Sequence, residues 1–290
     1  MTANTRKNFL GLPEEYSAEA DARFVVLPIP YEQTTTYVKG TRYGPEAIIE
    51  ASQQVELYDE EFGSEPYTIG ISTAQDVDPN ASPQGTLEEI YRSVSNILEK
   101  GKTPIALGGE HSITVGIVKA FTEKIKDVTV LQLDAHADLR DEYLGSKLNH
   151  ACTAWRLLEY APIVQVGVRS LSKEEADSIK ERNLAVFFAQ EMRKNSSWEK
   201  VISQLGKNVY VSIDLDVFDP GIMPSVGTPE PGGLGWYDVL ELVQGIARKR
   251  DIVGFDVVEL CPQPGNIAPD FTAAKLIYKM IGYIVAFGKI

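Results

Sequence analysis

Residues 128–138 read Val-Thr-Val-Leu-Gln-Leu-Asp-Ala-His-Ala-Asp, an apolar run of strand length that ends in three possible metal ligands. The same arrangement recurs at residues 209–216, Val-Tyr-Val-Ser-Ile-Asp-Leu-Asp, and at residues 104–111, Pro-Ile-Ala-Leu-Gly-Gly-Glu-His. In an open α/β sheet, ligand sites lie beyond the carboxyl ends of the strands. The three blocks therefore predict a single site that is built from strand ends.

Further apolar runs of strand length recur along the chain with helical stretches between them, which is typical of β-α units in a mostly parallel sheet. Eight runs qualify as strands: residues 24–27, 68–71, 104–107, 128–131, 163–166, 184–187, 209–212 and 252–255. We therefore expect an α/β fold with a central sheet of about eight strands.

Spacing also predicts two helices. Apolar residues at 87, 90, 94 and 97 share one helical face, with Thr86 and Glu89 as a capping box and Gly101 as the stop. A second face, at residues 239, 242, 243 and 246, follows Trp236 and ends in three basic residues, 248–250. No internal repeat or low-complexity linker divides the chain, so we expect one domain over residues 1–290.

Charge and composition exclude several classes of protein. The chain has 290 residues, with 41 acidic and 28 basic side chains and a net charge of -13, whereas nucleic-acid binding needs a basic face. Two cysteines are too few for a disulfide framework. The first twenty residues lack an apolar run of signal-peptide length, and no later run is long enough to span a membrane. We expect a cytoplasmic protein without nucleic-acid or membrane partners.

The strand-end blocks contain two imidazoles and four carboxylates, which are too many for one tetrahedral site but suit two divalent ions with bridging carboxylates. Each residue alone would more often be a helix cap or an ordinary polar group, yet two of the three histidines in the chain lie in these blocks. Hard carboxylate ligands favour Mn²⁺, and two such ions activate a bridging hydroxide near neutral pH. We therefore predict a binuclear metallohydrolase with six ligands: His111, Asp134, His136, Asp138, Asp214 and Asp216.

The blocks resemble the signature of the ureohydrolase family, which includes arginase, agmatinase, guanidinobutyrase and formiminoglutamase. The resemblance extends over residues 28–259 and includes Gly-Thr-Pro at residues 227–229 and Gly-Gly-Leu at residues 232–234. It implies a three-layer α/β/α arginase-like fold, two Mn²⁺ per chain, homo-oligomers that are trimers or hexamers, and hydrolysis of a guanidino group to urea and an amine.

The resemblance also implies how the ligands divide between the two ions. One Mn²⁺ would be held by His111, Asp134, Asp138 and Asp214. The other would be held by His136, Asp134, Asp214 and Asp216, so that Asp134 and Asp214 bridge the pair.

Further residues acquire roles from the same resemblance. His150 matches the loop histidine that passes protons between solvent and the leaving amine, although alone it would be read as an ordinary residue at a helix start. Glu259 corresponds to the carboxylate that holds the guanidinium, although alone it would be read as surface charge. Thr228 is expected to add a hydrogen bond to the same group, and Asp138 to redistribute the proton of the attacking hydroxide.

The loop after the Asp-Ala-His block bears on the substrate. Arginases carry an Asn two residues after the last Asp and a Ser-Gly-Asn run before the catalytic histidine, whereas this chain has Arg140 and Gly-Ser-Lys-Leu-Asn at residues 145–149. Residues 138–145 instead resemble bacterial and archaeal agmatinases. We therefore expect a small cationic guanidino substrate, first of all agmatine, which would give putrescine and urea.

Several alternatives remain at this stage. Guanidinobutyrate is the runner-up because Arg140 or Lys147 could pair with its carboxylate, and arginase or formiminoglutamase activity is also possible within the family. A polyamine or acyl-lysine deacetylase of the same fold keeps a single zinc, so His111 and Asp138 argue against it. A noncatalytic scaffold would not require His150 and Glu259.

Overall fold

Eight parallel strands form a single sheet in the computed structural model, which describes residues 7–79, 82–194 and 198–288. The strand order is β2-β1-β3-β8-β7-β4-β5-β6. The strands are β1 Phe24–Ile29, β2 Ile71–Thr73, β3 Thr103–Gly108, β4 Val128–Leu133, β5 Ile163–Val168, β6 Ala185–Phe188, β7 Asn208–Asp214 and β8 Asp251–Val258.

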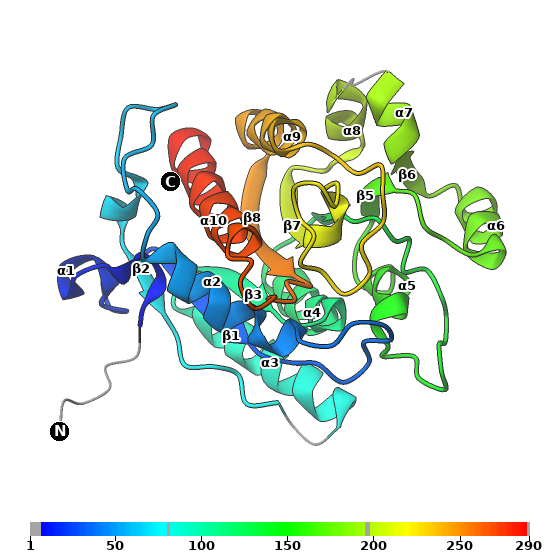
Figure 1. The fold of residues 1–290 in the computed structure, drawn as a ribbon, viewed down its shortest axis with the longest axis horizontal. Helices are drawn as coiled ribbons and strands as arrows, with labels where there is room; N and C mark the ends of the chain where they lie inside the picture. The colour runs from blue at the N-terminus through cyan, green and yellow to red at the C-terminus, as the bar shows by residue number, and fades with distance from the viewer. Residues whose placement is uncertain (1–6, 80–81, 195–197, 289–290) are drawn as a thin grey trace.

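Helices cover both faces of this sheet, as Figure 1 shows, and complete the three layers that were expected. One layer contains α2, α8, α9 and α10, and the opposite layer contains α3, α4 and α5. The helix bounds are α1 Glu14–Ser17, α2 Gly44–Ser52, α3 Pro83–Glu99, α4 Thr114–Lys124, α5 Thr153–Leu157, α6 Lys173–Arg182, α7 Ala189–Lys194, α8 Trp198–Gln204, α9 Trp236–Lys249 and α10 Ala268–Phe287.

The strand predicted at residues 68–71 is wrong in its position, whereas the other seven runs lie in or overlap observed strands. Pro66–Ile69 form a 3-10 helix instead, and β2 begins only at Ile71. Gly70 separates the two elements with a φ of +89°, and a Cβ at this position would lie 2.8 Å from the Cα of Ala22. Only glycine fits that close turn, so the backbone cannot run through it as a strand.

The helix predictions need one correction. Helix α3 begins at Pro83 rather than near Thr86, because the side chain of Ser82 caps it by accepting a hydrogen bond from the Gly85 N–H (3.1 Å). The predicted stop is confirmed, since the helix ends at Glu99 and Gly101 has a φ of +70°. Helix α9 spans Trp236–Lys249 as expected, with basic residues in its last turn.

The four central strands bring distant blocks of sequence together. In the sheet, β8 and β7 lie between β3 and β4. In the sequence, β4 follows β3 directly, and β7 and β8 come last. The register pairs Leu133 of β4 with Ile213 of β7, and Asp214 of β7 with Val258 of β8. The carboxyl ends of these strands therefore meet at one edge of the sheet.

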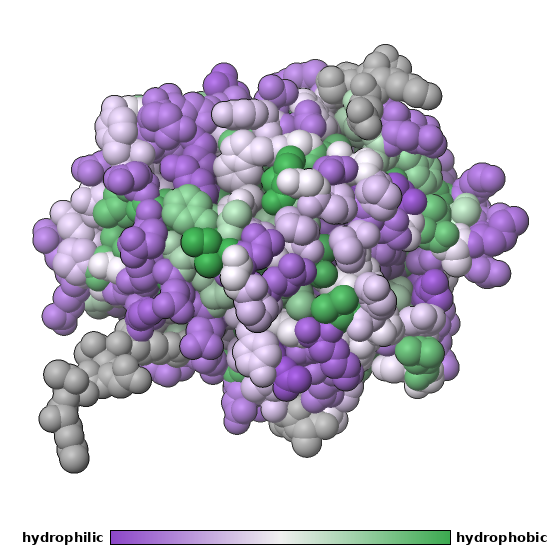
Figure 2. Space-filling view, in the orientation of Figure 1, coloured by the Kyte–Doolittle hydropathy of each residue, from purple (hydrophilic) through white to green (hydrophobic). Residues whose placement is uncertain are grey.

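The surface in Figure 2 is mainly hydrophilic, with small hydrophobic patches that are separate from one another. Among the residues that the structure describes, no helix combines the length and the hydrophobicity that crossing a membrane requires.

Candidate metal centre

The six predicted ligands all lie at the carboxyl edge of the central strands. His111 follows β3 and begins a 3-10 helix, Asp134 directly follows β4, and Asp214 is the last residue of β7. Asp138 and Asp216 come shortly after the latter two strands, and both are buried. His136 is the one partly exposed member of the six, with 24% of its side chain accessible. The structure therefore brings together every residue that the sequence singled out as a ligand.

The chain curls through these ligands instead of continuing as an extended strand. Asp138 has a left-handed φ of +51°, and Asp216 lies in the 3-10 helix Leu215–Val217. Local hydrogen bonds cause this curl: Asp134 Oδ1 accepts from the His136 N–H (2.6 Å), and Asp214 Oδ1 accepts from the Asp216 N–H (2.9 Å). Such bonds from a carboxylate to a backbone group two residues on favour turns over strands.

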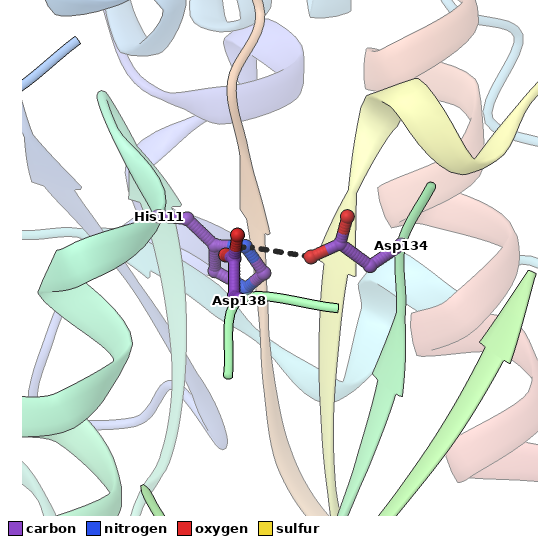
Figure 3. A group of neighbouring side chains, drawn as sticks. All are labelled: His111, Asp134 and Asp138. Atoms are coloured by element: carbon purple, nitrogen blue, oxygen red, sulfur yellow. Dashed lines mark ion pairs between the residues drawn. The ribbon is translucent and has the colours of Figure 1, made fainter. Parts of the chain in front are cut away.

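One group of ligands surrounds Nδ1 of His111. This atom lies 3.0 Å from Asp134 Oδ2, 3.4 Å from Asp138 Oδ2 and 3.3 Å from Asp214 Oδ2. Figure 3 shows how His111, which follows β3, approaches Asp134 and Asp138 of the segment that follows β4. Although three carboxylates are so close, Nδ1 is buried and makes no hydrogen bond with any of them. A buried nitrogen without a partner among carboxylate oxygens fits a ligand set for a divalent cation.

A second group shares one carboxylate with the first. Asp134, His136 and Asp216 each offer an atom that lies within 4.8 Å of the others. Nδ1 of His136 lies 2.7 Å from Asp216 Oδ2 and 3.8 Å from Asp134 Oδ1. Because Asp134 belongs to both groups, the arrangement suits two neighbouring ions with a bridging carboxylate.

Without a cation, the cluster retains protons. Burial raises the pKa of Asp138 to about 7, and the charge of Asp134 adds to the effect. Burial also raises the pKa of Asp214 well above its ordinary value, with Asp216 as the next cause. For His136, burial opposes the charged ring, but Asp216, Asp134 and Asp138 together outweigh it and raise the pKa to about 11. Cations that bind here must displace these protons.

The other nitrogen of His111 faces a buried polar network that sequence reasoning missed. Nε2 lies 3.0 Å from Ser212 Oγ, and that hydroxyl donates to Asp256 Oδ1 (2.7 Å). Burial raises the pKa of Asp256, while the charge of His111 and donation from Tyr210, Ser212 and Thr114 lower it. Spacing could have revealed part of this network, because Tyr210, Ser212 and Asp214 alternate along β7 and share one face of the sheet.

Glu259 and His150 lie beside the metal-ligand cluster. Glu259 follows β8 with a left-handed φ of +66°, and its Oε1 accepts a hydrogen bond from the His111 N–H (2.8 Å). Burial raises the pKa of Glu259 to about 8, with the charge of Glu110 as the next cause. Nδ1 of His150 lies 3.9 Å from Glu259 Oε1, and burial lowers the pKa of His150 to about 4. These two predicted residues therefore adjoin each other and the ligands.

A second missed contact fixes the segment that carries His150. Buried Glu110 accepts hydrogen bonds from the Thr34 N–H and hydroxyl (both 2.6 Å). The hydroxyl oxygen of Thr34 in turn accepts a hydrogen bond from the His150 N–H (2.8 Å). Glu110 could have been suspected from the sequence because it directly precedes the predicted ligand His111. Thr34 lies in a loop without a recognisable pattern, so the sequence did not indicate its contacts.

The remaining predicted residues have simpler surroundings. Thr228 is partly buried on a loop in which Val226 pairs with Leu260, the residue after Glu259. Glu230, which was not predicted, accepts a hydrogen bond from Ser170 (2.9 Å), and its Oε1 lies 4.0 Å from His136 Nε2.

An all-parallel α/β sheet with buried His and Asp ligands at its carboxyl edge is typical of a metal-dependent hydrolase. A sequence model described as the arginase family matches residues 22–282, and the chain belongs to that family. The N(1)-aminopropylagmatine ureohydrolase of Synechocystis sp. is 44% identical to this chain, over 93% of this chain and 92% of that protein. The N(1)-aminopropylagmatine ureohydrolase of Thermus thermophilus is 41% identical, over 90% of this chain and 90% of that protein. The crystal structure of the agmatine ureohydrolase of Thermoplasma volcanium superposes with a TM-score of 0.88 at 34% identity, over 96% of this chain and 94% of that one. The expected family, fold and enzyme class, an agmatinase-like ureohydrolase, are thereby confirmed.

Proposed function

We propose that the chain is a binuclear manganese hydrolase that releases urea from a guanidino compound with a cationic tail. The observation that carries this proposal is the convergence of carboxylates on the buried Nδ1 of His111, which makes no hydrogen bond, with Glu259 and His150 beside it. Two bound Mn²⁺ would supply an activated water and stabilise the charge that develops during its attack.

The ligand sets follow the two groups. His111, Asp134, Asp138 and Asp214 would hold one ion, and His136, Asp134 and Asp216 would hold the other. The family resemblance adds Asp214 to the second set as another bridging carboxylate. Carboxylate oxygens dominate both sets and neither contains a thiolate, which supports Mn²⁺ over a structural zinc ion.

The other residues would bind the substrate and move protons. Glu259 is positioned to pair with the guanidinium, because the His111 N–H holds its carboxylate in place. Asp138 would accept a proton from the attacking water, and His150 would deliver one to the leaving amine. Since burial lowers the pKa of His150 to about 4, the ring is neutral near pH 7 and must draw each proton from solvent before passing it on.

The entrance loop favours a cationic tail over a carboxylate. Arg140 lies 3.8 Å from buried Glu175 and stacks on Tyr143, while Lys147 lies 3.8 Å from Asp141. Both cations that were considered as partners for a substrate carboxylate thus already have acidic neighbours. This argues against guanidinobutyrate and arginine, and the net charge of -13 favours polycations.

Two polycationic substrates remain in consideration. The sequence alone favoured agmatine, and the similar structure from Thermoplasma volcanium is named for that activity. Four relatives that are 35–44% identical are named N(1)-aminopropylagmatine ureohydrolases, so we place N(1)-aminopropylagmatine first and agmatine second.

A urea-release assay with Mn²⁺ tests the proposal. We expect N(1)-aminopropylagmatine and agmatine to be hydrolysed with higher kcat/KM than arginine or guanidinobutyrate, and also than formiminoglutamate, whose hydrolysis is followed by the formamide that it releases instead of urea. Faster hydrolysis of any of the three carboxylated compounds would contradict the proposal that the substrate has a cationic tail. Metal analysis of the same sample should give two ions per chain, whereas one ion would favour a deacetylase.

A further inference from the structure

A buried chain of hydrogen bonds lies behind His111, on the side of the ring away from the carboxylate cluster. It runs from Nε2 of His111 to the hydroxyl of Ser212 (3.0 Å) and from that hydroxyl to Asp256 Oδ1 (2.7 Å). Ser212 and Asp256 are paired residues on the adjacent strands β7 and β8, and each of the three side chains is at most 1% exposed. Neither Ser212 nor Asp256 belongs to the proposed ligand sets.

The donors in this network can be counted. Tyr210 and Thr114 both donate their hydroxyl hydrogen to Asp256 Oδ2, at 2.7 and 3.0 Å, and Ser212 donates to Oδ1. The hydroxyls of Thr114 and Ser212 also lie 3.3 Å apart, but each hydrogen is already directed to Asp256 over a shorter distance. An ionised carboxylate only accepts, and a serine hydroxyl carries a single hydrogen. Because Ser212 gives that hydrogen to Asp256, its oxygen is left as an acceptor toward His111. The hydrogen in the bond between His111 and Ser212 must therefore come from Nε2.

This assignment fixes the lone pair of the imidazole. A neutral ring that carries its hydrogen on Nε2 has its lone pair on Nδ1. Nδ1 is the atom that lies 3.0–3.4 Å from Asp134, Asp138 and Asp214 without a hydrogen bond to them. The opposite tautomer would place a hydrogen among these carboxylates and leave no lone pair for a cation.

We propose that Asp256, acting through Ser212, is a positioning residue that sets the tautomer and orientation of His111 for metal binding. Partners of this kind on the far nitrogen of a ligand histidine typically change metal affinity by about 10–100-fold. The inference rests on the proposed metal centre, but it does not depend on which guanidino compound is the substrate.

The tautomer can be observed directly by NMR of protein with ¹⁵N-labelled histidine, because the chain has only three histidines. Zn²⁺ serves as a diamagnetic probe in the holoprotein, and a His111→Asn sample identifies the His111 signals. We expect a slowly exchanging hydrogen on Nε2 of His111, which Ser212→Ala should lose. A hydrogen on Nδ1 of His111 in the wild-type holoprotein would overturn the inference.

Mn²⁺ affinity gives a second measurement, from the electron paramagnetic resonance signal of the free ion. Ser212→Ala should weaken binding at the His111 site by about 10–100-fold. Tyr210→Phe is the matched control, since it removes another buried hydroxyl from Asp256 but leaves the bonds of Ser212 intact. Its Mn²⁺ affinity should stay closer to that of the wild type than the affinity of Ser212→Ala does.

The possible failures can be told apart. Equal Mn²⁺ affinities in Ser212→Ala and Tyr210→Phe would overturn the positioning role, while the metal centre would stand. Wild-type protein that binds no Mn²⁺ at all would overturn the proposed function itself.

Discussion

At the scale of single residues, Asp134 connects the two halves of the candidate metal centre. Its Oδ2 lies 3.0 Å from Nδ1 of His111 and accepts a hydrogen bond from Gln132 (2.7 Å). Its Oδ1 faces His136 and accepts a hydrogen bond from that residue's N–H. The side chain is wholly buried, so both oxygens are held by the protein rather than by solvent.

Asp134→Ala should therefore abolish binding of two ions per chain, because each group loses the carboxylate that they share. Metal analysis after dialysis measures the loss, and urea release should fall to background. Asp177→Asn, on the exposed surface of α6, is a control that should leave both values unchanged. Full metal occupancy together with normal turnover in Asp134→Ala would exclude a bridging role.

His150→Asn should separate proton delivery from metal binding. Removing a general acid typically lowers kcat by about 100-fold or more. Because His150 is not among the groups that converge on the two ligand sets, the variant should still bind two ions per chain. A variant that keeps the wild-type kcat would show that another group protonates the leaving amine.

At the scale of elements, strand ends were predictable and the loops that complete the site were not. The blocks around His111, Asp134 and Asp214 follow apolar runs, so their common edge follows from the rules of parallel sheets. The bond from His150 to Thr34 spans 116 residues and joins two irregular segments, which no hydrophobic period marks. The left-handed conformation of Asp138 likewise follows from no repeating pattern in the sequence.

Thr34→Val should test whether this loop contact matters. The variant removes the acceptor for the His150 N–H and the hydroxyl donor to Glu110, so His150 loses one of its anchors. We expect kcat to fall about tenfold, because small displacements of catalytic groups are costly. Thr34→Ser keeps the hydroxyl and should retain activity. Normal activity in Thr34→Val together with a loss in Thr34→Ser would mean that the methyl group, not the hydrogen bonds, is what matters.

At the scale of the whole molecule, the fold holds several ionisable groups in a neutral form that the unfolded chain would not. Burial raises the pKa of Asp138 to about 7 and that of Glu259 to about 8, far above their values of 3.8 and 4.5 in the unfolded chain. The folded metal-free protein thus binds more protons than the unfolded chain, and its stability must decrease as pH rises through these values.

Chelator-treated protein should consequently have a Tm that falls between pH 6.5 and pH 8. The lowered pKa of His150, about 4, has the opposite effect, but only below its ordinary value of 6.5. Glu259→Gln should make this dependence shallower without removing it, because glutamine does not titrate whereas Asp138 and His136 still do. Differential scanning calorimetry measures both curves. A Tm that rises over this interval in metal-free wild type would contradict the assignment.

The pairing of β3 with β8 has a consequence for biosynthesis. The N–H of His111 bonds to Glu259 across 148 residues of chain, and β8 separates β3 from β7 in the sheet. A ribosome synthesises the amino-terminal part of the chain first. A nascent chain in which β8 has not yet been made therefore lacks the strand between β3 and β7 and also lacks Glu259. Metal binding at this centre would therefore have to wait until β8 has been synthesised and has joined the sheet.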